Sequence, residues 1–433
     1  MLPLPRKQLC MSSLLGRVRS CFLKVPDPLE TGSQKTIPLV DHLMSGMAVF
    51  GLKCPSLLDY DKKRFDNMIG ANLSTLYWVK TPPSDTYLRE RLDTVNPATI
   101  RRSFTKLFAT FQRGKGLEEF MFMDQYVLLS GDGSGLFSSN CVSCPHCCEK
   151  VEKNGKTTYY HQLFGVSIVH PDKRNVIPLC PEVIMKEDGA TKNDCERNAC
   201  KRFLENFRRE HPHLKAIFLA DGLSSTGPNI KMLEEKGLKY ILGAKPGDHV
   251  YLFDQLDASE KTQYHELKTE DGKYHQFRFL NRSQLNKSHP DICVNVIEYR
   301  VTDRRGKELN FSWVTNLEVN KSNVLEITRG GRARWKIENE TFNTLKNLGY
   351  NLEHNYGHGK QYLSTVFGML MMLAFLIDQI LEVCCPLFQR AKKKIGTYRG
   401  FWEVMRALFM YIPFSNWENF YLTILKERAL DSS

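Results

Sequence analysis

Two aspartates occupy matching positions in this sequence, each after an apolar segment and directly before a glycine. Asp132 follows the segment QYVLLSG (residues 125–131), and Asp221 follows AIFLA (residues 216–220). An acid at the end of a rigid strand is held in place, and the glycine lets another backbone or a phosphate approach closely. Two such carboxylates favour a hard cation, which prefers oxygen ligands. An Asp-Gly pair is also typical of a simple turn, so a third element has to decide between the two interpretations.

The third element is an acid inside a basic segment, RARWKIENETFNTLK (residues 332–346). Arg334 and Glu338 are four residues apart, so on a helix they share one face. The helix is predicted from an apolar stripe at helical spacing, made of Trp335, Phe342 and Leu345. One acid among many cations suits a site that holds both a metal and phosphates, whereas the alternative is an ordinary surface ion pair. The surrounding cations are Arg329, Arg332, Lys336 and Lys346.

Other acids compete for a place in such a site. Glu340 is two residues from Glu338, about 200° around an α-helix, so both cannot face the same side. Three further acids, Asp188, Asp194 and Glu196, lie near the start of a predicted helix and are interpreted as helix-start acids.

A cysteine-rich segment, CVSCPHCC (residues 141–148), follows Asp132. A C-x-x-C pair is a good half-site for zinc, and the candidate ligands are Cys141, Cys144, Cys147 and His161, with His146 as a competitor. A structural zinc would clamp the hairpin that contains the segment. Reduced thiols without a metal remain an equal alternative, because no second C-x-x-C is present.

The elements that must position the acids form a mixed sheet. Short apolar segments predict strands at residues 125–130, 161–170, 175–179, 216–220 and 239–244, and a charged segment predicts a helix at 193–210. Three strands followed by alternating helices and strands indicate an α/β fold with a mixed five-stranded sheet covered by helices. We therefore expect a catalytic core at residues 119–245 and 321–385, interrupted by a β-rich insertion at 246–320.

The flanking regions are predicted to be helical. Residues 1–35 are expected to form a flexible basic arm, 36–118 a helical DNA-binding region, and 386–433 a C-terminal helical region. The DNA-binding interpretation of the second region rests on its cations, and a solvated helix face is the equal alternative. These cations are Arg101, Arg102, Lys106, Arg113 and Lys115.

Composition agrees with a nucleic-acid partner. The 433 residues include 60 Lys and Arg against 48 Asp and Glu, a net charge of +12. Each phosphate neutralised by a cation releases counterions, so this surplus favours a polyanion. The chain opens with no apolar signal segment, and its longest apolar run, 366–377, is too short to span a bilayer. We expect a cytoplasmic, nucleoid-associated protein with mostly reduced cysteines, of which there are 13.

The arrangement of the three acids resembles that of the DDE transposases of bacterial insertion sequences, which have a ribonuclease-H-like fold. The segment around Glu338 is similar to the signature of the insertion-sequence-four group: Tyr, two residues, Arg, three residues, Glu, six residues, Lys. Arg334 and Glu338 match it, Gly331 stands at the tyrosine position, and Lys346 falls one residue late. The resemblance covers roughly residues 125–380 and includes FLADGL, YILGAKPGDH and GYNLEHNYGHG.

This resemblance implies an enzyme that cuts and joins DNA with Asp132, Asp221 and Glu338 holding two Mg²⁺ ions, for which Mn²⁺ substitutes, and with Arg334 in the site. Ions about 3.5–4 Å apart would activate a water or a 3′-hydroxyl for in-line attack on a phosphodiester. The implied partners are double-stranded terminal inverted repeats and target DNA, bound by a homodimer. The alternatives are a nuclease of the same fold that does not join ends, and an inactive DNA-binding descendant.

Additional candidate DNA contacts follow from the same resemblance. Phe311 and Trp313 are two residues apart on a predicted strand, so they share a face, and either could stack on a flipped base. Core packing is the alternative for at least one of them. The remaining candidates are Lys245, Arg329, Arg332, Lys336 and Lys346.

Overall fold

The protein is built around one eleven-stranded sheet, described by a computed structural model for residues 7–27, 37–186 and 193–426. The main strand order is β2-β3-β1-β6-β7-β11-β10-β9-β8, and β4 and β5 both pair with β3. The strands are β1 (Val127–Ser139), β2 (Cys148–Val151), β3 (Thr157–Val169), β4 (Ile177–Pro178), β5 (Glu182–Ile184), β6 (Ala216–Ala220), β7 (Lys239–Gly243), β8 (Gln263–Lys268), β9 (Tyr274–Asn286), β10 (His289–Thr302) and β11 (Glu308–Thr315).

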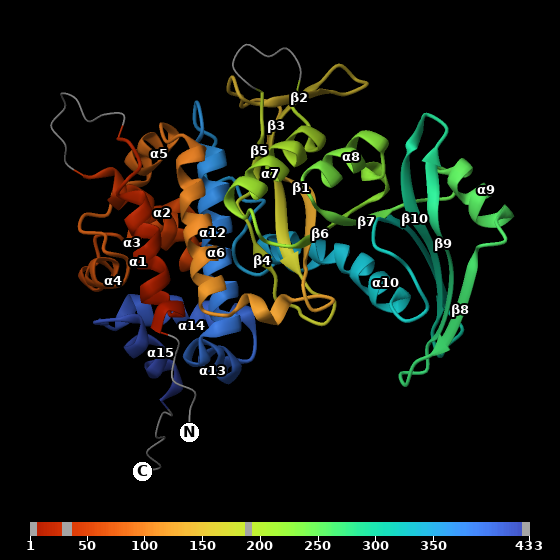
Figure 1. The fold of residues 1–433 in the computed structure, drawn as a ribbon. Coiled ribbons are helices and arrows are strands. Elements are labelled where there is room, and N and C mark those ends of the chain that lie inside the picture. Colours follow the sequence, from red (N-terminus) through yellow and green to blue (C-terminus); the bar gives the residue numbers. More distant parts are fainter. Residues whose placement is uncertain (1–6, 28–36, 187–192, 427–433) are drawn as a thin grey trace.

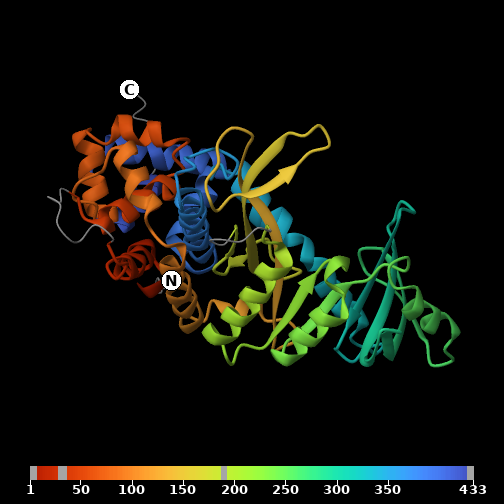
Figure 2. The ribbon, with the colours of Figure 1, turned by 90° about the horizontal axis from the view of Figure 1, so that it is seen from above.

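Three parts follow one another across the molecule: a helical body, the central sheet and the β-rich insertion (Figures 1 and 2). The helices are α1 (Met11–Phe22), α2 (Leu39–Gly51), α3 (Leu57–Lys63), α4 (Asn67–Tyr77), α5 (Asp85–Asp93), α6 (Arg101–Arg113), α7 (Glu196–Glu210), α8 (Gly227–Glu235), α9 (Val250–Ala258), α10 (Val324–Arg332), α11 (Asn343–Asn347), α12 (Leu363–Cys384), α13 (Pro386–Ile395), α14 (Tyr398–Tyr411) and α15 (Trp417–Leu425).

The central sheet confirms the predicted mixed α/β fold, and its strand order is consistent with the ribonuclease-H-like fold that the resemblance implies. β1 and β3 are antiparallel, β4 and β5 pair with the far side of β3, and β6 and β7 run parallel to β1. All five residues of β6 are buried, which explains its continuous apolar sequence. Helix α7 turns its buried face toward the sheet, with Ala199, Phe203, Leu204 and Phe207 at helical spacing.

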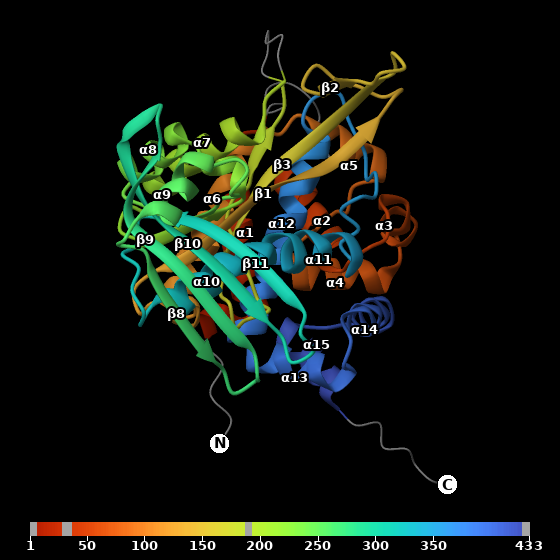
Figure 3. The same cartoon turned by 90° about the vertical axis from the view of Figure 1, so that its right-hand side faces the viewer.

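The insertion extends the same sheet. β11 pairs antiparallel with β7, with Trp313 opposite Gly243, and β10, β9 and β8 follow as a meander. Figure 3 shows these strands as a curved layer in front of α10, with α11 to one side of β11. Helix α9, at the start of the insertion, is absent from the sequence-based prediction.

The helical body joins both ends of the chain in one hydrophobic core. Contrary to the expected flexible arm at residues 1–35, part of that region forms α1, where Leu14, Leu15 and Val18 are buried; residues 1–6 and 28–35 lie outside the described residues. Helix α12 contacts both α2 and the strands β1, β3 and β4. Of the described helices it alone has the length and hydropathy of a membrane span, but 89% of its most apolar window is buried inside the protein, as in a core helix.

The segment predicted as one amphipathic helix is broken into three kinds of helix. After α10 come a 3-10 turn (Ala333–Trp335), a π-helical segment (Ile337–Phe342) and α11. The expected apolar stripe is wrong at one position, because Trp335 is 50% exposed whereas Phe342 and Leu345 are buried. The change of helical pitch turns Trp335 out of the core and into a surface groove.

Candidate active site

Asp132 lies in the middle of β1, and the turn predicted behind it is not formed. The strand continues to Ser139, and Asp132 pairs with Gly165 on β3. A side chain at position 165 would meet the Phe342 ring at 3.0 Å, so the glycine lets the glutamate segment lie against the sheet. The acid is therefore fixed by a continuous strand and by a helix packed behind it.

Asp221 comes directly after β6, as the sequence predicts. β6 is the parallel neighbour of β1, with Ser130 opposite Leu219, so the two aspartates come from adjacent strands. The Asp221 carboxylate accepts a hydrogen bond from the Leu223 backbone N–H at 3.1 Å, which fixes one of its oxygens.

Glu338 reaches the same region from the π-helical segment. Its Oε1 accepts a hydrogen bond from Nη1 of Arg334 at 3.0 Å, and the same Nη1 lies 4.0 Å from Oδ2 of Asp132. Glu340, the competing acid, points elsewhere, with its Oε2 3.7 Å from Nε of Arg174. Of the two glutamates, the structure therefore brings Glu338 to Asp132.

Two buried hydroxyl contacts hold the glutamate segment on the sheet. Ser130 on β1 donates a hydrogen bond to the backbone carbonyl of Arg334 at 2.8 Å, and Ser167 on β3 lies 3.1 Å from the Thr341 hydroxyl. All three hydroxyl side chains are fully buried. Sequence reasoning missed these contacts because a serine within an apolar strand carries no signal for its partner.

A fourth acid, Glu196 at the start of α7, lies beside the two aspartates. A side chain at position 133 would collide with the Glu196 carboxylate, so Gly133 provides the space for it. Glu196 was expected to be only a helix-start acid. Its position at the helix start is confirmed, but it also shares the cleft of about 890 Å³ that Asp132, Asp221 and Arg334 line.

Two acids in this cleft, Asp132 and Glu196, have raised pKa values. The pKa of Asp132 is raised to about 6, chiefly by burial and also by the charges of Glu196 and Glu338, while a hydrogen bond from the Gly133 N–H and the charge of Arg334 lower it. Burial, and then the charge of Asp221, raises the pKa of Glu196. A concentration of carboxylates with Arg334 as the cation nearest to Asp132 and Glu338 is unfavourable unless a further positive charge binds.

The donor set fits a hard divalent cation, which takes carboxylate oxygens and would relieve this repulsion. Among the described residues, the acids do not form a group whose ligand atoms all lie within 4.8 Å of one another. These acids therefore cannot all ligate the same ion in this arrangement, and one ion with a single coordination sphere does not explain why they lie together.

A groove of about 760 Å³ adjoins the acids and is lined by aromatic and cationic side chains. The rings of Phe311 and Trp313 stack at 5.7 Å, the Arg332 guanidinium lies 4.9 Å from the Phe311 ring, and Trp335 is half-exposed beside Arg334. Lys245 and Asp221 also line the groove. Such a surface offers stacking faces together with phosphate-binding cations.

A family model described as a transposase DDE domain matches residues 156–376, just over half of the chain. The chain belongs to the DDE transposase domain family. The matched region includes Asp221 and Glu338 and begins after Asp132. No curated protein matches the sequence. Among solved structures, piggyBac transposase in a synaptic complex with hairpin DNA is similar, with 12% identity, a TM-score of 0.43, and coverage of 98% of this chain and 82% of that one. Similarity at this level does not bear on function.

In this DDE transposase chain, the absence of the signature tyrosine has a steric reason. A side chain at position 331 would lie 2.7 Å from Cε2 of Trp313, so the indole ring occupies the space of any residue larger than glycine. Trp313 itself is 6% exposed, so core packing accounts for most of its surface, and Phe311 is the more accessible of the two rings.

Several of the cations predicted to contact DNA are paired with the protein itself. Arg329 forms an ion pair with Asp172, Lys336 donates a hydrogen bond to the Lys173 carbonyl at 2.6 Å, and Lys346 lies 3.0 Å from Glu353. These three cations line neither the cleft nor the adjoining groove. Arg332, Arg334 and Lys245 do line the groove, and Arg334 also lines the cleft. In the N-terminal region, Arg101 is turned inward onto Glu182 and Glu210.

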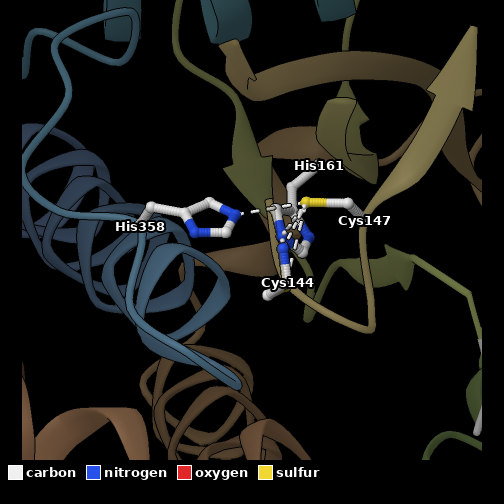
Figure 4. A group of neighbouring side chains, drawn as sticks. All are labelled: Cys144, Cys147, His161 and His358. Carbon is white, nitrogen blue, oxygen red and sulfur yellow. Dashed lines mark hydrogen bonds between the residues drawn. The ribbon is translucent and has the colours of Figure 1, made fainter. Parts of the chain in front are cut away.

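The cysteine segment forms a cluster, but with a different fourth member from the one predicted. Cys144, Cys147 and His161 come together with His358, from the loop before α12, and their ligand atoms all lie within 4.8 Å of one another (Figure 4). Cys141 is exposed and outside the group, so its prediction as a ligand was wrong. His358 was missed because it is about two hundred residues from the other three, and nothing in its local sequence marks it as a ligand.

Proposed function

We propose that this protein cuts DNA at the ends of a mobile element and joins the ends to a target, with Asp132, Asp221 and Glu338 as the catalytic acids. The observation that supports it best is the contact of Arg334 with both Asp132 and Glu338, residues 206 positions apart in the sequence. A surface ion pair would need only Arg334 and Glu338. Here Arg334 also approaches Asp132 on the central strand, and both of these residues line the same cleft.

These three acids would hold Mg²⁺, with Mn²⁺ as a substitute. Bound there, two such cations supply activation of a water or 3′-hydroxyl and stabilisation of the leaving oxygen. Arg334 then has a separate task. Its planar guanidinium, positioned by the Ser130 hydrogen bond to its backbone, can donate to the scissile phosphate as negative charge develops.

The adjoining groove would hold the DNA. Arg332, Lys245 and the exposed face of Trp335 lie along it, so phosphates and an unstacked base could both be accommodated. Within the family, we propose a relative of the bacterial insertion-sequence-four group, on the strength of the Arg334–Glu338 pair and the β insertion between β7 and α10. Action as a homodimer on terminal repeats in the cytoplasm belongs to the same proposal.

The test is to incubate the purified protein with the DNA that flanks its own gene and with Mg²⁺. Free 3′-hydroxyl ends and strand-transfer products are expected. Asp132→Ala and Glu338→Gln should abolish cleavage and leave DNA binding largely intact, since binding draws on cations. Glu340→Gln is the matched control, because that acid lies on the same segment but faces Arg174.

The outcomes separate the alternatives. Cleavage without joining would identify a nuclease of the same fold. Specific binding without cleavage by the wild-type chain would identify an inactive descendant. Equal loss of cleavage in Glu338→Gln and Glu340→Gln would contradict the assignment of Glu338.

A further inference from the structure

The cluster of Cys144, Cys147, His161 and His358 brings together three separate segments of the chain. The cysteines lie in the loop between β1 and β2, His161 is on β3, and His358 belongs to the loop between α11 and α12. Figure 4 shows the two imidazoles converging on the sulfur of Cys147 from different sides. Nothing in the proposed DNA-cutting chemistry uses these residues.

The distances match a tetrahedral metal site. The two sulfurs are 3.8 Å apart, Nε2 of His161 lies 3.4 Å from each of them, and Nε2 of His358 lies 3.2 Å from Sγ of Cys147. Around a zinc ion with Zn–S of about 2.3 Å and Zn–N of about 2.0 Å, a regular tetrahedron has an S–S edge of about 3.8 Å and S–N edges of about 3.5 Å. The sulfurs are too far apart for a disulfide, in which they would be about 2.05 Å apart.

The surroundings are those of a closed site. Cys147, His161 and His358 are buried, and Cys144 is partly buried. Nδ1 of His358 lies 2.8 Å from the Gly359 carbonyl, a contact that places the ring proton on Nδ1 and leaves Nε2 free to bind a metal. The neighbouring candidate His146 has other partners, since its Nδ1 lies 3.2 Å from the Lys186 carbonyl and its ring stacks on Tyr362.

The loop that carries His358 is held firmly from the opposite side. The carboxylate of Asp93, at the end of α5, accepts hydrogen bonds of 2.8–3.0 Å from the backbone N–H groups of residues 360–363. The histidine is therefore presented by a loop that is already fixed to the helical body. A metal at the cluster would connect this body directly to the hairpin of the central sheet.

We propose that Cys144, Cys147, His161 and His358 bind one structural Zn²⁺ that fastens the β1–β3 hairpin to the loop before α12. Four protein ligands leave no open position, so the ion has a structural role and takes no part in the reaction. His161 is four residues along β3 from Gly165, the partner of Asp132, or about 13 Å at 3.3 Å per residue. The ion therefore anchors the strand pair that carries a catalytic acid without touching the acid.

The test measures metal content in the full-length protein purified without chelators. Wild type is expected to contain about one zinc per chain, and Cys147→Ser and His358→Ala less than about a tenth of that. Cys141→Ser and His354→Ala are matched controls that should keep the metal, because both residues are exposed neighbours outside the cluster. His358→Cys should restore binding, since a Cys₃His set is also a zinc site.

Cobalt substitution in the wild-type chain keeps the test independent of how the variants fold. Bound Co²⁺ should show the visible bands of tetrahedral geometry and the charge-transfer band of thiolate ligands. Metal-free wild type with a Cys144–Cys147 disulfide, or with two free thiols that do not take up zinc or cobalt, would overturn the proposal. Loss of zinc in Cys141→Ser with retention in His358→Ala would overturn the ligand set.

Discussion

Replacing Asp132 with asparagine should make the protein more stable in the absence of divalent cations while it abolishes DNA cleavage. The reason is that the ionised carboxylate is unfavourable in the empty cleft. Burial, together with the charges of Glu196 and Glu338, raises the pKa of Asp132 from its ordinary value of 3.8 to about 6, against the lowering effect of the Gly133 N–H and Arg334. An amide of the same shape carries no charge and removes this cost.

The magnitude follows from the change in pKa. At 1.36 kcal/mol per pKa unit, a rise from 3.8 to about 6 corresponds to about 3 kcal/mol. Because the side chain is 33% exposed, solvent screening reduces this to about 1–2 kcal/mol. With an unfolding entropy of roughly 2.1 cal/mol/K per residue over the whole chain, the expected gain in Tm is about 1–2 °C.

The pH dependence has a definite sign. A carboxyl with a raised folded-state pKa destabilises the fold when it is ionised, so the full cost is present above about pH 6 and disappears as the pH falls from about 6 to about 4. The difference in Tm between Asp132→Asn and wild type should therefore be positive at pH 7.5 and close to zero near pH 3.5.

Scanning calorimetry in buffer without divalent cations and without chelator measures this difference and leaves a bound zinc in place. Asp254→Asn, a change at an exposed acid on α9, is the control and should have no effect. Saturating Mg²⁺ should reverse the order, because only the wild type binds the cation fully. A less stable Asp132→Asn at pH 7.5 without cations would refute the reasoning.

Three further predictions follow from the contacts of the site and the core. Arg334→Lys should lower single-turnover cleavage by roughly tenfold to a hundredfold at saturating DNA, because an ammonium lacks the planar fork, and a near-wild-type rate would remove Arg334 from catalysis. Ser130→Ala should cost about 1–3 kcal/mol in urea denaturation by leaving the partly buried Arg334 carbonyl without its 2.8 Å partner, and an unchanged midpoint would contradict this role. Lys53→Met should cost about 3–5 kcal/mol because it strands the buried Asp378 charge, and adding Asp378→Leu should restore most of that stability; a double variant no more stable than the single would disagree.

The central sheet could be predicted from sequence because its strands are short apolar segments with clear ends. The residues AIFLA, all buried, correspond to β6 without error. β1 was cut short because its sequence turns from apolar to glycine-rich at Gly131, although pairing with β3 continues to Ser139. Glycine favours turns only when no partner strand supplies hydrogen bonds, and the partner is invisible to a local pattern.

Only the part of the candidate site that lies on one helical segment could be predicted from residue spacing. Arg334 and Glu338 share a face as their four-residue spacing implies. Glu196 and His358 could not be found in this way, because their neighbours come from other elements of the fold. Asp378 ends the apolar run at residues 366–377 but not the helix, because Lys53 and Tyr350 partner its carboxylate inside the core and α12 continues to Cys384.

The most direct test of the catalytic assignment is a crystal of the protein soaked in Mn²⁺, with the anomalous scattering of manganese used to locate the ions. The assignment predicts manganese peaks within coordination distance, about 2.0–2.2 Å, of Asp132, Asp221 and Glu338 oxygens, and none at these acids in Asp132→Asn. Peaks at Glu340, or no ordered manganese in this cleft at saturating concentration, would contradict it.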